Sequence, residues 1–272
     1  MNAHEIDYKI FGDDMQFVEI ELDPGETVMA EPGAMMMMDD VIEMNTIFGD
    51  GSKQNDSLMG KLFSAGKRVL TGESLFMTAF TNRGSGKKHV SFSAPFPGKI
   101  IPVDLSRHSG KLICQKDAFL CAAKGVSIGL EFTKKIGAGF FGGEGFILQS
   151  LQGDGMAFVH AGGTLYRRDL APGEVFKVDT GSLVGFTATV DYDIQFVGGI
   201  KNTLFGGEGV FYARMQGPGT VWVQSLPFSR LADRVIASAP RAGGKSRGEG
   251  SILGGLGNLL DGDNRFYRGE VR

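Results

Sequence analysis

Short apolar runs that alternate with polar residues dominate the chain, and glycine-containing turns separate them. In the segment FILQSL, residues 146–151, both faces of an extended strand carry apolar side chains. That pattern is typical of a strand packed between two layers. The phrases QGDG and QGPG, residues 152–155 and 216–219, each lie between two such runs and predict hairpin turns. The pattern therefore predicts an all-β fold.

One sequence unit recurs along the chain. Residues 22–26 read LDPGE and residues 170–174 read LAPGE, whereas a weaker form, SGK, stands at residues 109–111. Each opening leads through an alternating run to a Gly-Glu segment, and a hairpin pattern follows it. Such self-similarity at a steady period is the signature of a repeated structural unit.

We expect three repeats, at about residues 5–96, 97–162 and 163–227. A single hairpin unit cannot bury both of its faces, so the units must pack against one another. The prediction is three tandem β-sandwich or short double-stranded β-helix modules around a pseudo-threefold axis, within residues 1–239.

The Gly-Glu segments place Glu73, Glu144 and Glu208 at equivalent positions in the three units. In one interpretation each carboxylate accepts hydrogen bonds from turn amides or meets a lysine of the next unit. In the other, the three carboxylates converge near the axis and could hold a cation. The structural interpretation is favoured, because no further motif supports a metal.

The end of the chain predicts one helix and a tail. Leucine, valine and isoleucine recur at helical spacing over residues 228–237, directly after Pro227. Residues 240–272 are rich in glycine and read as a flexible linker followed by an amphipathic segment. We expect this segment either to dock on a partner, another subunit or a membrane surface, or to stay disordered. Its apolar residues are Ile252, Leu253, Leu256, Leu259 and Leu260.

Charge is distributed unevenly, although the net charge is only −3. Residues 1–60 hold 2 basic and 14 acidic side chains, whereas residues 61–168 hold 15 and 6. The favoured interpretation is that these two sectors pair within the fold or are simply solvated, and the alternative is oriented self-association. The small net charge gives no general attraction to nucleic acid.

Cysteine usage and the N-terminus bear on location. The chain has two cysteines, Cys114 and Cys121, which do not form a disulfide framework. The N-terminal residues lack the pattern of a signal peptide, and no apolar run is long enough to span a membrane. We therefore expect a cytoplasmic protein.

Candidate catalytic and cofactor motifs are weak. Residues 137–142 match the dinucleotide fingerprint literally, but a strand pattern follows where the fingerprint needs a helix. The run Met35–Met38 is interpreted as core packing rather than copper binding. The histidines lack metal-site spacing, and no serine lies in a nucleophile elbow. We therefore expect no catalytic residue, metal or cofactor. The four histidines are His4, His89, His108 and His160.

The segments LDPGETVMAEPGAMMMM, FFGGEGFILQSLQGDGMAFVHAGG and LFGGEGVFYARMQGPG resemble the AIM-type mitochondrial-biogenesis family. The resemblance covers about residues 5–237. It implies a fold similar to that of the tryptophan-RNA-binding attenuation protein, with the unit repeated in one chain. The mitochondrial relatives are linked to inner-membrane organisation, and the family provides no established catalytic residues.

Three functions follow as expectations. The first is a non-enzymatic, homo-oligomeric scaffold or interaction protein that touches a protein or membrane partner through its tail. The second is a binding module for RNA or another polyanion, suggested by analogy of fold and by the basic sector. The third, least favoured, is a cupin-like metal or small-molecule enzyme.

Overall fold

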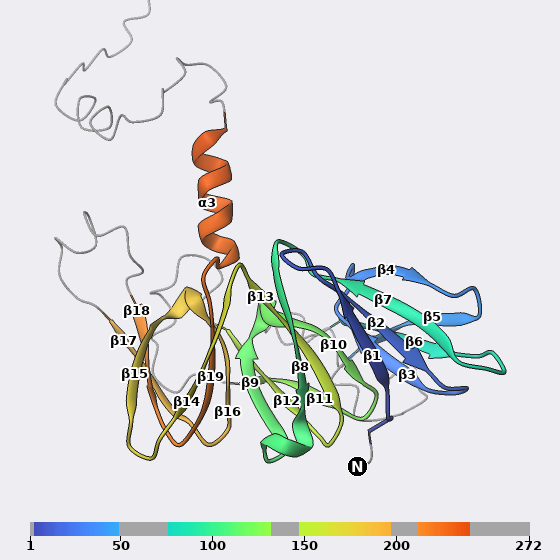
Figure 1. Cartoon of the computed structure of the whole chain (residues 1–272), viewed down its shortest axis with the longest axis horizontal. Helices are drawn as coiled ribbons and strands as arrows, with labels where there is room; N and C mark the ends of the chain where they lie inside the picture. Colours follow the sequence, from blue (N-terminus) through green and yellow to red (C-terminus); the bar gives the residue numbers. More distant parts are fainter. Residues whose placement is uncertain (1–2, 49–75, 132–146, 197–210, 240–272) are drawn as a thin grey trace, which may run out of the picture. The chain divides into compact units, whose positions relative to one another are not determined.

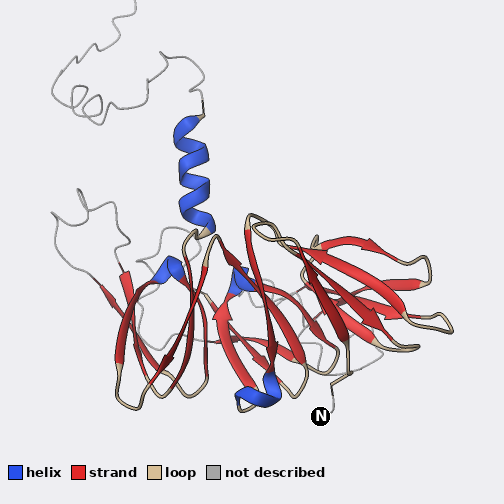
Figure 2. Cartoon of the chain, in the orientation of Figure 1, coloured by secondary structure: helices blue, strands red, loops and turns tan. Residues whose placement is uncertain are grey.

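The computed structural model describes residues 3–48, 76–131, 147–196 and 211–239 of the chain (Figure 1). Strands dominate the described residues, and one α-helix follows them, as Figure 2 shows. The predicted all-β class is therefore confirmed. Residues Met1–Leu231 form one compact unit, and Ala232–Arg272 form a second.

The described strands, short 3₁₀ helices (η) and helix follow one another along the chain. Their bounds are β1 (Asp7–Phe11), β2 (Phe17–Leu22), β3 (Thr27–Ala30), β4 (Met35–Met38), β5 (Ile42–Phe48), β6 (Phe76–Asn82), β7 (Lys88–Ser93), β8 (Gly98–Asp104), η1 (Leu105–His108), β9 (Lys111–Gln115), η2 (Lys116–Ala118), β10 (Phe119–Ala123), β11 (Ser127–Glu131), β12 (Leu148–Gln152), β13 (Met156–Gly162), β14 (Leu165–Leu170), β15 (Val175–Asp179), η3 (Thr180–Ser182), β16 (Leu183–Thr187), β17 (Asp191–Phe196), β18 (Phe211–Gln216), β19 (Gly219–Gln224) and α3 (Phe228–Ser238).

The strands form four sheets. Sheet A has the order β1-β2-β7-β4, sheet B β5-β6-β3-β10-β13-β8, sheet C β11-β12-β9-β16-β19-β14, and sheet D β15-β18-β17. Neighbouring strands are antiparallel in each of them. The turns at residues 153–155 and 217–218 join β12 to β13 and β18 to β19, as the hairpin patterns predict.

The sheets are layered around three apolar cores. Phe80 of sheet B meets Phe92 of sheet A with ring centroids 5.2 Å apart in the core between these sheets. Met29 of sheet B and Trp222 of sheet C both belong to the second core. Sheets C and D enclose the third, to which Phe186 belongs. Because sheets B and C are covered on both faces, their strands are apolar at consecutive positions.

The same strand pairing recurs along the chain. Strands β4, β10 and β16 pair with β7, β13 and β19, and each shows a register shift at the same place, beside Met36, Leu120 and Val184. Strands β3 and β9 then pair with β10 and β16, which joins neighbouring sets of strands into one sheet. The pseudo-threefold axis and the repeat boundaries stay predictions.

The Pro-Gly-Glu openings form tight turns stabilised by their own glutamate. Gly25 has φ +87° and Gly173 has φ +77°, values that favour glycine over residues with a side chain. The Glu26 carboxylate accepts a hydrogen bond from the Asp23 backbone N–H at 2.8 Å. Glu174 does the same for Ala171 at 2.9 Å, so the motif closes equivalent turns.

The helix predicted over residues 228–237 is present as α3. It follows Pro227, whose carbonyl accepts a hydrogen bond from the Leu231 N–H. Val235 and Ile236 are exposed. In the part of the chain that the structure describes, no helix has the length and apolar character needed to cross a membrane.

Lysine in place of Met29 tests the layered arrangement. Met29 lies in the core between sheets B and C, four residues after Gly25. Lys177 lies four residues after Gly173 on β15 and is exposed, because no further sheet covers it among the described residues. We expect Met29→Lys to lower the free energy of unfolding by about 3–5 kcal/mol, since it buries an unpaired charge. Lys177→Met, the matched control, should change it by less than about 1 kcal/mol. Urea unfolding would measure both, and equal effects would contradict the layering.

Candidate functional site

The candidate residues predicted from sequence lie outside the described residues. These are Glu73, Glu144 and Glu208 of the Gly-Glu segments, the fingerprint-like residues 137–142, and the tail residues Ile252, Leu253, Leu256, Leu259 and Leu260. Their proposed roles stay predictions. The site described below was found from the structure instead.

Strand β4 is an apolar strand at an open edge. It pairs with β7 on one side, and it is the last strand of sheet A among the described residues. The exposed fractions of Met36, Met37 and Met38 are 44%, 46% and 39%. The prediction that this run packs in the core is therefore wrong for these three methionines. Met35 alone is half-buried and packs against the core between sheets A and B.

The equivalent strands show why β4 is unusual. In β10 the residues at the places of Met36–Met38 are residues 120–122, and their exposed fractions are 1%, 0% and 0%. In β16 the residues are also buried. Strands β3 and β9 lie along the outer edges of β10 and β16 and cover them. Strand β4 is also apolar, but no strand among the described residues lies along its outer edge.

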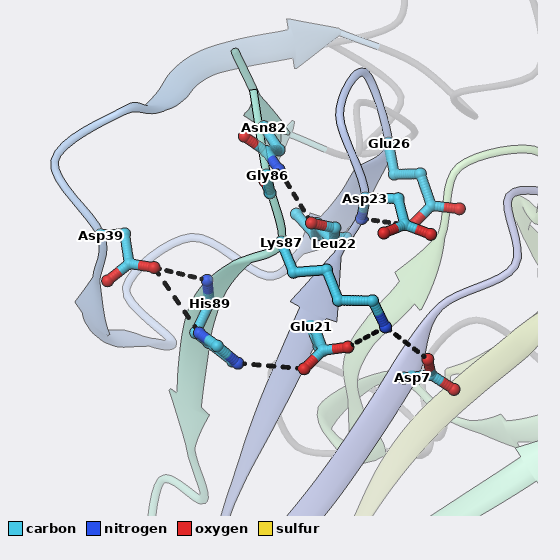
Figure 3. A network of polar contacts seen from close by, with 10 residues as sticks. All are labelled: Asp7, Glu21, Leu22, Asp23, Glu26, Asp39, Asn82, Gly86, Lys87 and His89. Carbon is cyan, nitrogen blue, oxygen red and sulfur yellow. Dashed lines mark hydrogen bonds and ion pairs between the residues drawn. The ribbon is translucent and has the colours of Figure 1, made fainter. Parts of the chain in front are cut away.

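A row of polar and charged side chains crosses sheet A at the end of β4 (Figure 3). His89 of β7 lies between two carboxylates: its Nε2 is 3.3 Å from Glu21, and its Nδ1 is 3.6 Å from Asp39. The His89 backbone N–H donates to the Asp39 carboxylate at 2.9 Å, and the Asp39 N–H donates back to the His89 carbonyl at 3.0 Å. These bonds fix the residue that follows β4.

Lys87 extends this row toward β1. Its ammonium group pairs with Glu21 and lies 3.6 Å from Asp7 (Figure 3). The hydrogen bond from Lys87 lowers the pKa of Glu21, and the same contact raises the pKa of Lys87. Behind them, buried Asn82 donates to the Leu22 and Gly86 carbonyls, both at 2.8 Å, and so holds the β6–β7 turn. The row is thus a connected set of polar contacts across sheet A.

Several basic residues of the sector 61–168 pair with carboxylates of the acidic sector 1–60. Arg83 pairs with Glu43 at 2.5 Å, and Lys99 lies 3.7 Å from Asp14. Together with Lys87, these contacts show that part of the basic sector pairs with the acidic sector within the fold. Exposed pairs of this kind contribute little stability individually, typically below about 1 kcal/mol. Their effect is to place a carboxylate beside each of these three cations.

Metal-ligating side chains and cysteines bear on what chemistry this part of the chain could support. Within residues 3–48, 76–131, 147–196 and 211–239, no group of three histidine, cysteine or acidic side chains is arranged to hold a metal ion. Cys114 and Cys121 are free and buried, and burial raises the pKa of Cys114 to about 12. A buried thiol that stays protonated is a poor nucleophile. The distinctive feature of sheet A is its apolar edge.

His160 of β13 is a buried titratable group away from this edge. It is 2% exposed, and its ring packs edge-on to Phe96 at 4.4 Å. Neither ring nitrogen has a regular hydrogen-bond partner among the described residues. Burial lowers the pKa of His160 to about 4, and the Phe96 backbone opposes part of this effect. Glu31, at the end of β3, shows the opposite behaviour, because burial raises its pKa to about 7.

We expect His160 to destabilise the fold in acid. Its pKa is about 4 when folded and 6.5 in the unfolded reference, so the unfolded chain binds the proton more readily. The contribution of neutral His160 is complete above pH 6.5 and is lost as the pH falls toward 4, which amounts to ~3 kcal/mol.

His160→Gln should remove this dependence, because Gln224 stands at the same place on β19 and does not titrate. The measurement is urea unfolding of both proteins between pH 4 and 8, taken as the difference between them. The difference cancels the Glu31 contribution, which falls with rising pH between 4.5 and 7. Parallel curves for the two proteins would contradict the assignment.

Comparison with known proteins places this architecture in a family. The family model described as "Mitochondrial biogenesis AIM24" matches residues 8–226. An uncharacterised protein of Streptococcus pyogenes serotype M6 is 30% identical over 223 residues, which cover 80% of this chain and 85% of that protein.

A crystal structure of a Streptococcus pyogenes protein has a similar fold, with a TM-score of 0.68 at 21% sequence identity. The match covers 86% of this chain and all of that one. The family match spans the strands from β1 to β19, including the open edge of sheet A. The chain therefore belongs to the AIM24 mitochondrial-biogenesis family.

Proposed function

We propose that this protein is a non-enzymatic, homo-oligomeric scaffold that holds protein chains together through the open edge of sheet A. The observation that carries the proposal is the exposure of Met36–Met38 on a strand whose equivalents in β10 and β16 are buried. An exposed apolar strand at a sheet edge is a template for pairing with another chain. Natural edge strands usually carry charges or proline that prevent this pairing.

The other end of the layered sheets supports the proposal by contrast. On β15, one of the two edge strands of sheet D, Lys177 lies on the outer face, where its ammonium group is 4.7 Å from the centre of the Tyr212 ring. A charged residue on an edge strand opposes association. In the described part of the chain, a charge therefore protects the β15 edge, whereas the β4 edge carries exposed methionines, which favours association through β4 over association through β15.

The alternative, binding of RNA or another polyanion, has less support. It rests on the resemblance to the tryptophan-RNA-binding attenuation protein and on the basic sector. Lys87, Arg83 and Lys99 of that sector each lie beside a carboxylate. Paired cations release fewer counterions on binding a phosphate backbone, so their contribution to affinity is small.

A membrane-related role belongs to the same proposal and concerns the tail. Ile252, Leu253 and Leu256 open an amphipathic pattern, and the family is described by mitochondrial biogenesis. A cytoplasmic scaffold could use such a segment to reach a membrane surface. We expect the full chain to float with vesicles of phosphatidylglycerol, and a chain ending at Ala239 to remain unbound. Equal flotation of both would remove the tail from the proposal.

Light scattering tests the oligomeric scaffold directly. We expect the full chain to have more than the mass of one copy at moderate concentration, and the chain ending at Ala239 to retain this mass because it keeps β4. Loss of assembly on truncation would assign the contact to the tail. Two monomeric proteins at every concentration and salt level would contradict the oligomeric scaffold altogether.

A further inference from the structure

The backbone groups that β4 presents can be identified from its equivalents. The outer edge of β10 gives three contact points to β3: the Leu120 carbonyl accepts from the Glu31 N–H at 3.0 Å, Ala122 stands opposite Met29, and the Lys124 N–H donates to the Thr27 carbonyl at 3.0 Å. In an antiparallel pair the residues that face one neighbour alternate along the strand.

The corresponding groups of β4 follow from the shared register shift. Met35, Met37 and Met38 pair with β7 as residues 119, 121 and 122 pair with β13. The outer edge of β4 therefore presents the Met36 carbonyl, both backbone groups of Met38, and the Asp40 N–H. Met38 stands midway between the acceptor and the donor. The edge is thus complementary to itself when one copy is turned by a twofold rotation.

We infer that two copies of this chain pair antiparallel through β4, with Met38 of one copy opposite Met38 of the other. The inference rests on the proposed oligomeric function and specifies its interface. In this register each Met38 N–H donates to the Met38 carbonyl of the second copy. Each Asp40 N–H donates to the Met36 carbonyl of the second copy, so the interface is isologous.

Strand β15 of a second copy fits this edge less well. By the pairing of β3 with β10, it would place Lys177 opposite Met38, where Met29 lies opposite Ala122. If copies stacked on one another through β4 and β15, the outer faces of sheets A and D would also become buried. Charged residues such as Glu21 and Arg214 would then lose their contact with water and gain no suitable partner, which costs free energy. Pairing of β4 with itself leaves both outer faces exposed.

The side chains of β4 suit the twofold register. Met38 lies opposite Met38 of the second copy, and Met37 lies opposite Asp39 of the second copy, so like charges are not directly opposed. Methionine side chains adapt their shape readily and pack well against one another. The charges nearest the twofold axis, Asp39 and Asp40 of both copies, are acidic. Salt should therefore strengthen the association by screening them, whereas it would weaken a contact between these acids and Lys177.

A charge exchange at Met38 tests the inference in the full-length chain. Because Met38 faces itself, Met38→Asp places two carboxylates opposite each other, and Met38→Lys places two ammonium groups there. We expect each variant alone to dimerise at least about tenfold more weakly than the parent. An equimolar mixture of the two should dimerise again, because the heterodimer pairs opposite charges. Sedimentation equilibrium at low and high salt measures all of these.

Met44 provides the matched control. It is 54% exposed on β5, at the edge of sheet B and not on β4. Met44→Asp and Met44→Lys should dimerise like the parent. Urea unfolding and circular dichroism of each variant show that the fold is kept, so that a loss of association reports on the interface.

The possible results separate the interface from the proposed function. If the parent assembles and both Met38→Asp and Met38→Lys assemble as strongly as it does, this interface is overturned. The oligomeric scaffold itself would then still stand. Stronger association of Met38→Asp with weaker association of Met38→Lys would place a cation such as Lys177 opposite, and this also overturns it. A parent that is monomeric at every concentration overturns both.

A spin-label measurement provides a second readout that does not depend on charge. Cys114 and Cys121 are buried and free, so a nitroxide reacts selectively with Met38→Cys. Paired antiparallel strands bring facing Cα atoms to about 5.5 Å, so the two labels should be within about 20 Å. A concentration-dependent short distance supports the register, and a dimer without it contradicts the pairing.

Discussion

Backbone pairing between β3 and β10 and between β9 and β16 is the interaction on which the rest of the structure depends. Each pair involves a short run of residues: Val28–Ala30 meet Cys121–Ala123, and Leu112–Cys114 meet Gly185–Thr187. Yet these contacts join half-sheets into the six-stranded sheets B and C. At the second junction there is no room for a side chain, since a Cβ on Gly185 would lie 2.8 Å from the Ile113 carbonyl oxygen.

The layered cores follow from this joining. Because β3 pairs with β10, sheet B is continuous, and one of its faces meets sheet A while the other meets sheet C. Val28 and Met29 therefore lie in different cores. Sheets A and D each have one face without a covering layer among the described residues, and these faces carry charged rows such as Glu21 with His89. End layers with polar outer faces are what keeps a stacked architecture from growing indefinitely. The two end sheets also differ at these edge strands, where β15 carries Lys177 and β4 carries Met36–Met38.

Local patterns predicted the parts of the fold that local chemistry determines. Alternation and glycine turns predicted the strands and hairpins, and Pro227 with helical spacing predicted α3, because each depends on neighbouring residues in the chain. The pairing of acidic and basic sectors was also predictable from charge. The order of strands in the sheets was not, because it depends on backbone pairing between distant segments, which has no side-chain signature. The candidate glutamates and the tail lie outside the described residues, so their sequence interpretations stay untested.

The misjudged run Met35–Met38 shows where sequence reasoning fails and why the failure is informative. The shared register shift shows that this run is equivalent to strand β16, residues 183–187. Burial, however, depends on the strand that lies alongside: β9 covers β16, whereas β4 has no such neighbour in the described chain. A strand whose composition suits a covered position but whose outer edge is open violates the consistency expected of a stable monomer. Such a violation is resolved when another chain provides the missing strand, which is the physical basis for assigning an interaction function to this edge.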